Sequence, residues 1–305
     1  MNSDNRQSFL GPDSDHNLSA ATIGLVGLGG GGSHLVLQCA HLGIGRYILC
    51  DPDIIELSNT NRLVCGTISD VERELAKVEI AKRTIRALLP NAQIISITGS
   101  WQEAVEQLKL CDVIIGAVDS FTEREQLERF ARRYIIPYID IGMEVTHRPL
   151  LDDFLISGQV ILSFPGKACL RCCNFITDER LVQEAQQYGA AGGRPQVVWP
   201  NGVLASTAIG LMVQLLTPWS RFSVDFNYLE YDGNKSMIAS SFWVEQLRNK
   251  HCPHHPVDET GDPFFDIREY SKPHVTDQLS DVVEPRSSWM RPLKKLVGWL
   301  RKLRH

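Results

Sequence analysis

Residues 21–33 read ATIGLVGLGGGGS, a short apolar run followed by a cluster of glycines. The apolar run, residues 21–27, has the branched side chains typical of a buried parallel strand. Residues 34–42 then have the pattern of a helix. The glycines of the G-x-G-x-x-G pattern and its interior are Gly27, Gly29, Gly30 and Gly32. Because such glycines let the backbone approach a phosphate at a helix N-terminus, the stretch predicts a nucleotide-binding crevice. It does not separate NAD from ATP.

Strand and helix patterns alternate along the following chain. Apolar runs typical of buried strands lie at 47–50, 94–97, 112–118 and 137–141. Helical patterns lie at 70–89, 102–110 and 122–134. Alternation of this kind builds βαβ units. We therefore expect an α/β fold with a Rossmann-like, mostly parallel sheet and helices on both faces.

The pattern changes after residue 157. Residues 158–164 alternate in polarity, and 227–241 have the pattern of a hairpin around Asp232-Gly233, so we expect an antiparallel C-terminal extension. Between them, 177–200 is polar and glycine-rich, which predicts a mobile loop, and 202–216 is a strongly apolar helix.

The chain divides into four expected segments. These are an N-terminal arm at 1–20, a folded domain at 21–256, a linker at 257–285 and a basic amphipathic tail at 286–305. The tail has leucines at helical spacing between lysines and arginines. It is typical of a helix that binds an anionic membrane or a partner groove, or that packs on its own domain.

Composition excludes several classes of protein. With 305 residues, 43% hydrophobic and 22% charged, the chain is neither disordered nor fibrous. We find no apolar run of about 18 residues and no signal peptide, so we expect a cytoplasmic protein. Residues 1–285 carry 24 Lys and Arg against 36 Asp and Glu, while the last twenty residues carry seven basic groups and no acid. The acidic body argues against nucleic acid as a partner.

Polar residues after two of the expected strands indicate a triphosphate site. Asp51 ends the second strand, where it can accept hydrogen bonds from a ribose. Beyond it come Asn59, Arg62 and Lys77, and Asp119 follows the fourth strand. An amide and two cations would hold a triphosphate, and a carboxylate beside them would hold Mg²⁺. A dehydrogenase needs none of these groups, because hydride transfer develops no polyphosphate charge.

The segments VGLGGGGS, DPDIIELSNTNR, AKVEIAKRTI and DVIIGAVDS, in this order and spacing, resemble the ThiF/MoeB/HesA family of adenylating enzymes. These enzymes are related to ubiquitin-activating enzymes. The resemblance implies that Asp51 binds the ribose, that Asn59, Arg62 and Lys77 bind the phosphates, and that Asp119 holds Mg²⁺. It also implies that Arg6 reaches the neighbouring subunit's nucleotide site, and therefore a homodimer with two composite sites.

A cluster of cysteines indicates structural zinc. Cys169-x-x-Cys172 and Cys252-x-x-His255 offer four soft or borderline ligands in two knuckles eighty residues apart. Such a set suits a closed tetrahedral Zn²⁺ that clips the C-terminal segment onto the domain. Relatives carry CxxC twice, so the final histidine is a departure, and His251 or His254 is an alternative ligand.

A second departure concerns the catalytic cysteine. Relatives that form a thioester or persulfide carry a cysteine in the crossover region, but residues 176–200 have none. Cys65 and Cys173 remain as candidates, and neither matches the family position. We therefore favour adenylation without a protein nucleophile. The enzyme then accelerates the reaction by positioning the reactants and neutralising their charge.

Four functions compete for this sequence. The first is adenylation of the C-terminal glycine of a ubiquitin-like or sulfur-carrier protein, which uses every motif. The second is the same chemistry on another carboxylate, such as a peptide terminus or a modified tRNA base. A non-catalytic subunit has no need of Arg62, Lys77 and Asp119, and an NAD-dependent oxidoreductase leaves them unexplained.

Overall fold

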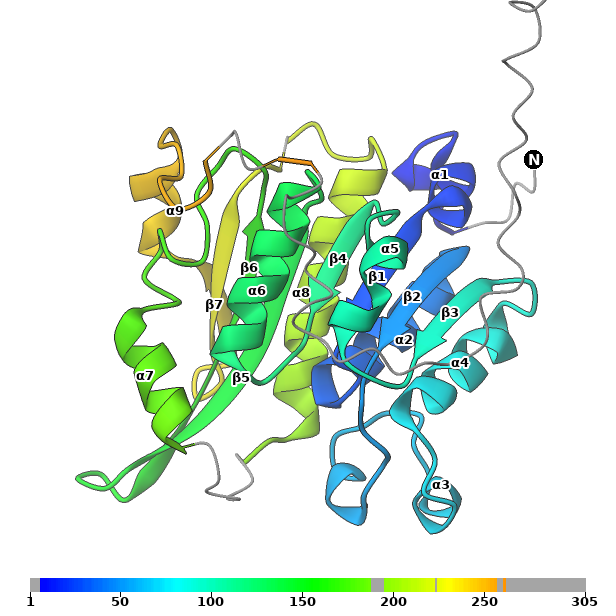
Figure 1. Cartoon of the computed structure of the whole chain (residues 1–305), viewed down its shortest axis with the longest axis horizontal. Helices are drawn as coiled ribbons and strands as arrows, with labels where there is room; N and C mark the ends of the chain where they lie inside the picture. The colour runs from blue at the N-terminus through cyan, green and yellow to red at the C-terminus, as the bar shows by residue number, and fades with distance from the viewer. Residues whose placement is uncertain (1–5, 188–194, 223, 257–259, 262–305) are drawn as a thin grey trace, which may run out of the picture. The chain divides into compact units, whose positions relative to one another are not determined.

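An eight-stranded sheet lies at the centre of the structure, a computed structural model that describes residues 6–187, 195–222, 224–256 and 260–261 (Figure 1). Its order is β3-β2-β1-β4-β5-β6-β7-β8. The strands are β1 (Thr22–Val26), β2 (Arg46–Cys50), β3 (Gln93–Ile97), β4 (Val113–Gly116), β5 (Tyr138–Arg148), β6 (Asp153–Ser163), β7 (Asn227–Asp232) and β8 (Met237–Ser240). The pairs from β3 to β5 are parallel and those from β5 to β8 antiparallel. The predicted sheet with an antiparallel extension is confirmed.

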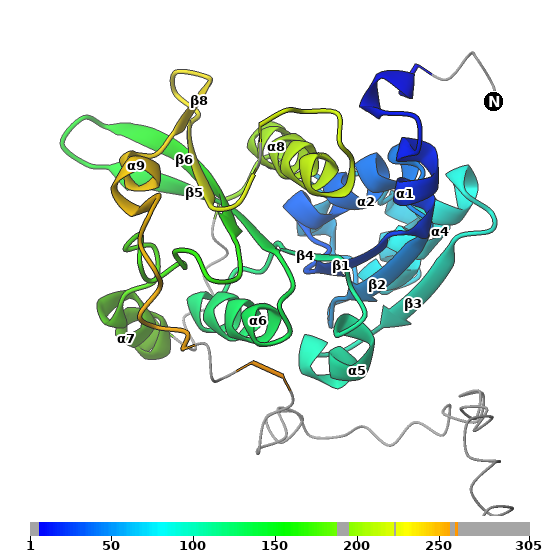
Figure 2. The same ribbon diagram turned by 90° about the horizontal axis from the view of Figure 1, so that it is seen from above.

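Helices cover both faces of this sheet, as predicted (Figure 2). One face carries α1 (Ser14–Ala20), α2 (Gly30–Leu42), α4 (Lys77–Leu88) and α8 (Val198–Leu216). The other carries η3 (Trp101–Ala104), α5 (Val105–Leu108) and α6 (Phe121–Arg133). The remaining short helices are η1 (Ser8–Leu10), η2 (Leu57–Asn59), α3 (Ile68–Glu72), α7 (Asp178–Gln187) and α9 (Phe242–Leu247). An apolar core is buried on each face of the sheet.

The helix predicted over 70–89 is interrupted, and the interruption serves the site. α3 ends at Glu72, and Glu74 has a positive φ of 49°. The following residues pair with the loop after β2: Ile55 N donates to Leu75 O at 2.9 Å and Lys77 N to Asp53 O at 3.0 Å. The helical pattern is thus overridden by a tertiary bridge that brings the start of α4 to the end of β2.

Two segments expected to be irregular contain helices. Residues 14–20, assigned to the arm, form α1, whose Leu18 is fully buried in the core beside α8. Residues 178–187, assigned to the mobile loop, form α7, which lies beside α6 (Figure 2). Residues 188–194 of that loop lie outside the described residues, as do 1–5, most of the predicted linker and the whole tail.

The apolar helix near 202–216 is α8, which begins earlier, at Val198. By length and composition it could cross a membrane, contrary to our reading of the sequence. Half of that window is buried, however, and α8 packs on α2, β5 and β6. Its place in the core therefore accounts for its apolar side chains.

Gly32 tests the turn between β1 and α2. A Cβ at Gly32 would lie 1.9 Å from the Gly27 carbonyl oxygen, so the Gly32→Ala variant must distort the turn. Overpacking of this kind costs about 1–3 kcal/mol, and we expect the melting temperature to fall by several degrees. The matched control is Gly210→Ala in α8, where a Cβ meets nothing within 4 Å and alanine should be neutral or stabilising. Equal melting temperatures for the two variants would contradict this account of the turn.

Candidate functional site

A cavity of about 350 Å³ opens at the carboxyl ends of β1, β2 and β4. β1 lies between β2 and β4 in the sheet, so the chain leaves neighbouring strands in opposite directions at this point. Crevices of doubly wound sheets bind ligands at such switch points. The glycine turn, the loop after β2, the start of α4 and the segment after β4 all contribute to the lining.

The glycine turn is held in place by backbone geometry and by Asp51. Gly27 has a φ of 83°, and a Cβ there would lie 2.6 Å from the Ala117 carbonyl oxygen. Asp51 accepts hydrogen bonds from Leu28 N at 2.5 Å and Asp53 N at 2.9 Å. Burial raises the pKa of Asp51, and Lys77 and these two N–H groups oppose that rise. The first turn of α2 therefore faces the cavity in a fixed position, as a phosphate site requires.

The predicted phosphate-binding residues Asn59, Arg62 and Lys77 all line this cavity. The Lys77 ammonium lies 2.6 Å from an Asp53 oxygen and 3.9 Å from an Asp51 oxygen, and its side chain is 10% exposed. Two cations from different segments therefore meet where the sequence predicts a triphosphate. Asp53 is the close partner of Lys77.

The S-N-x-N-R stretch shapes its own loop. Asn59 Oδ1 accepts from Glu56 N at 3.2 Å, as part of a capping box at the N-terminus of η2. Arg62 Nη1 donates to Ser58 O at 2.6 Å and to Asn61 Oδ1 at 3.1 Å. Glu56 thus shapes the loop. The guanidinium of Arg62 is directed by backbone of the same loop.

Asp119 lies where this cavity meets a second one. A groove of about 540 Å³ runs over β5, β6 and β7, with α7 at its side. Both cavities are lined by Asp119, Arg124, Gly142, Met143 and Gln196. Gln196 Nε2 lies 3.4 Å from Asp119 Oδ1, and Gln196 O accepts from Asn61 Nδ2 at 3.2 Å. Asp119 is therefore positioned to act on a group that spans both cavities.

The carboxylates near Asp119 fit a divalent cation. Glu123 also lines the nucleotide cavity, and its pKa is raised by burial and then by Glu184 and Asp119. Mg²⁺ binds proteins through one or two carboxylates and substrate phosphates, and Asp119 and Glu123 would offer such carboxylates beside a nucleotide.

Several lining residues were missed from the sequence. Gln196 and Asn201 stand at the approach and start of α8, and Arg124 projects from α6. A signal existed for Arg124, because it occupies the apolar stripe of its helix with Leu127 and Ala131. An acid inside a buried strand, Asp140, is its counterpart.

Arg6 is exposed and is not part of the lining in its own chain. Its neighbour Gln7 reaches the end of α2, where Nε2 lies 3.4 Å from His41 O. The function that the resemblance implies for Arg6, in the site of a neighbouring subunit, stays a prediction.

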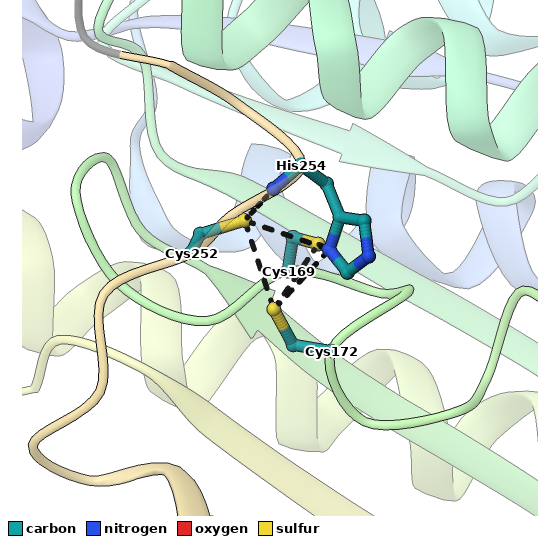
Figure 3. Close-up of side chains that lie close together, drawn as sticks. All are labelled: Cys169, Cys172, Cys252 and His254. Atoms are coloured by element: carbon teal, nitrogen blue, oxygen red, sulfur yellow. Dashed lines mark hydrogen bonds between the residues drawn. The ribbon is translucent and has the colours of Figure 1, made fainter.

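Three cysteines and one histidine converge as the sequence predicts, but the histidine is His254 (Figure 3). Sγ of Cys172 lies 3.6 Å from Sγ of both Cys169 and Cys252. His254 Nδ1 lies 3.4, 3.5 and 3.9 Å from the sulfurs of Cys169, Cys172 and Cys252. With Zn–S bonds of about 2.3 Å, a tetrahedral site places its ligand atoms about 3.8 Å apart, so these four fit zinc.

The fourth ligand expected from the sequence, His255, lies outside this set of four and belongs to a second group, with Glu128 and Cys169. Its Nε2 lies 3.8 Å from Glu128 Oε2, and Glu128 also accepts from Leu170 N at 3.0 Å. Residues 253–255 form a bend, and of the two adjacent histidines only His254 groups with all three sulfurs. His255 instead contacts the carboxylate that braces the first knuckle.

The candidate nucleophiles do not line the groove. Cys173 is 2% exposed, its Sγ lies 3.2 Å from Leu170 O, and burial raises the pKa of its thiol to about 12. Cys65 lies beside α4, and its carbonyl accepts from Arg83. None of the described residues that line the groove is a cysteine.

Comparisons with known proteins agree with this geometry. A model of the ThiF family matches residues 3–254. "Probable molybdopterin-synthase adenylyltransferase" of Porphyra purpurea is 34% identical over 114 residues, which are 37% of this chain and 29% of that protein. "Ubiquitin-like modifier-activating enzyme 5" of Xenopus laevis is 26% identical over 288 residues, covering 88% of this chain and 68% of that protein. The chain thus spans under a third of the first relative.

The fold also matches a crystal structure of E. coli MccB with AMPCPP and MccA. The TM-score is 0.62 at 20% identity, over 75% of this chain and 65% of MccB. At this identity the likeness shows a shared fold.

Replacing single histidines tests the metal cluster. We expect His254→Ala to lose zinc and to melt at a lower temperature, because a structural metal contributes directly to folding. The matched control is His255→Ala, which should keep its zinc. Elemental analysis and thermal melting read out both variants. Zinc lost from His255→Ala but retained by His254→Ala would overturn the assignment of the fourth ligand.

Proposed function

The chain belongs to the ThiF family, and on that premise we propose that it uses ATP and Mg²⁺ to adenylate a carboxylate, releasing pyrophosphate. The observation that carries this proposal is the meeting of two cavities at Asp119. One has a glycine turn and two cations, as a triphosphate requires. The other is an open groove through which a carboxylate would approach the α-phosphate.

The chemistry needs positioning and charge neutralisation. A carboxylate oxygen attacks the α-phosphorus, an acyl–AMP bond forms, and the bond to the β-phosphate breaks as pyrophosphate leaves. Arg62 and Lys77 would neutralise charge on the leaving phosphates, and the N-terminus of α2 would hold them through its N–H groups. Asp119 would hold Mg²⁺, which offsets further phosphate charge.

The substrate we propose is the C-terminal glycine of a ubiquitin-like or sulfur-carrier protein. The names of the relatives support this class. So does the groove, because Gly142, Ser157 and Gly158 are small residues of β5 and β6 in its lining, and an extended tail can lie along them. An acceptor would then take the acyl group from AMP without a protein thiol, because the crossover region, residues 176–200, contains no cysteine.

A second candidate is the same reaction on another carboxylate. The shared fold with MccB, whose structure contains AMPCPP and MccA, is the observation in its favour. In either case we propose a homodimer, in which Arg6 completes the partner's nucleotide site, and a structural zinc held by Cys169, Cys172, Cys252 and His254. A cytoplasmic location and a membrane or partner for the basic tail belong to the same proposal.

Asp119→Asn tests the reaction. With Mg²⁺ and a protein or peptide ending in Gly-Gly, we expect ATP–pyrophosphate exchange to fall by about 10²–10³-fold, as when one charge-stabilising group is removed. The control is Asp152→Asn, a fully exposed acid on the β5–β6 turn, which should exchange like the unaltered protein. Exchange by Asp119→Asn at the control's rate would sink the proposed role of Asp119.

Two cysteine variants test the absence of a protein nucleophile. Cys65→Ser and Cys173→Ala should both complete acyl transfer at rates within a few-fold of the unaltered protein. Cys173→Ala should melt earlier, because its side chain is buried. Mass spectrometry of the enzyme during turnover provides the second readout, and a thioester adduct on either residue would refute the mechanism.

A further inference from the structure

Arg124 lines both the nucleotide cavity and the groove, close to Asp119 and Gly142. Among the described residues it is the one arginine that lines both. It projects from the first turns of α6, and only 6% of the residue is exposed. Its position is therefore fixed by the protein, unlike that of an arginine on the rim. The proposed reaction gives roles to Arg62, Lys77 and Asp119 and none to Arg124.

Buried polar groups hold Arg124 in this position. Nη1 lies 2.5 Å from Asp140 Oδ2 and donates to Ile141 O at 3.1 Å. Asp140 is fully buried, and it accepts from Tyr138 Oη at 3.1 Å and from Gln159 Nε2 at 3.2 Å. A buried ion pair of this kind adds little to stability, because desolvation of both charges offsets their attraction. Its placement beside two cavities is therefore better explained by function.

The other end of the guanidinium is directed toward Gly142. A Cβ at Gly142 would lie 2.5 Å from Arg124 Nη2 and 2.5 Å from Gln159 Nε2. Within the described part of the chain, the hydrogen bonds of this guanidinium come from Nη1. Nη2 thus lies over a strand position without a side chain, at a point that both cavities share. Glycine here lets the guanidinium and the Gln159 amide lie against the strand, where a side chain would displace them.

We propose that Arg124 is a further catalytic residue, whose Nη2 binds the substrate carboxylate and directs its free oxygen at the α-phosphorus. Asp140 is a positioning residue, which holds the guanidinium through Nη1. This inference rests on the proposed function and deepens it, because it names the group that recognises the carboxylate. Arginine suits the task, since its planar fork can bind one carboxylate through Nη1 while a second approaches Nη2.

The assignment predicts discrimination between an acid and an amide. The probe is a synthetic peptide ending in Gly-Gly, as the free acid and as the C-terminal amide, titrated without ATP. We expect the unaltered protein to bind the acid at least tenfold more tightly. Arg124→Lys keeps a charge for Asp140 but lacks the second nitrogen, so the ratio should fall toward one. Equal binding of acid and amide by the unaltered protein would overturn the inference.

Kinetics separate a carboxylate site from a nucleotide site. In ATP–pyrophosphate exchange, Arg124→Lys should raise KM for the peptide at least tenfold and lower kcat about 10²-fold, with Kd for ATP changed less than threefold. The matched control is Arg132→Lys, another buried arginine of α6, which bonds to Ser163 and to carbonyls away from both cavities. If Arg124→Lys behaves like Arg132→Lys, or changes only Kd for ATP, the proposal is wrong.

Asp140→Asn decides the matter if Arg124→Lys fails to fold. It leaves the guanidinium in place with a neutral partner, and we expect a lower kcat and a lower acid-to-amide ratio. Unchanged values in a folded Asp140→Asn protein would refute the positioning role and, with it, the assignment. Loss of exchange by the unaltered protein with every carboxylate would instead count against the proposed function itself.

Discussion

The carboxylate of Asp51 ties together the two loops on which the candidate site depends. One oxygen accepts from Leu28 in the glycine turn, and the other accepts from Asp53 in the loop after β2. Asp53 in turn holds Lys77 at the start of α4. Three segments far apart in sequence are thereby set around one cavity. The cost of burying Asp51 is offset in part by Lys77 and two N–H groups, and its pKa remains raised.

Each of two cations around this cavity is held by a carboxylate on one side and faces the proposed reactants on the other. Lys77 has a carboxylate on one side and the cavity on the other, and Arg124 is held through Nη1 with Nη2 over Gly142. Such pre-set charges need no reorganisation when negative charge moves from a carboxylate to pyrophosphate. The cysteine–histidine cluster lies apart from the cavity and joins residues 169–172 to 252–254, so a metal bound there would act on the fold of the C-terminal segment.

The α/β fold and most of the nucleotide site could be predicted from the sequence, because they depend on local patterns. Period and glycine spacing are local signals, so β1, α2 and the alternating strands were predictable. Arg62, Lys77 and Asp119 follow strand ends or begin a helix, which brings them to one edge of the sheet. The break before α4 was not predictable, because it depends on pairing with a loop twenty residues away.

Other features depend on contacts that no local pattern records. Leu18 makes α1 part of the core, although its neighbours are polar. Which of two adjacent histidines meets all three sulfurs depends on how the chain enters the cluster, and in the structure it is His254. Arg124 and Asp140 were each visible as a charge inside an apolar pattern, but their pairing required the three-dimensional fold.

The central claim, attack of a carboxylate on the α-phosphate of ATP, is tested most directly by the fate of oxygen. A Gly-Gly-ended substrate would be labelled with ¹⁸O in its terminal carboxylate and turned over with ATP and an acceptor amine. The account predicts one ¹⁸O in the phosphate of AMP, with unlabelled pyrophosphate, because the bridging oxygen comes from the carboxylate. Label in inorganic phosphate, with ADP as the nucleotide product, would show attack at the γ-phosphate and contradict it.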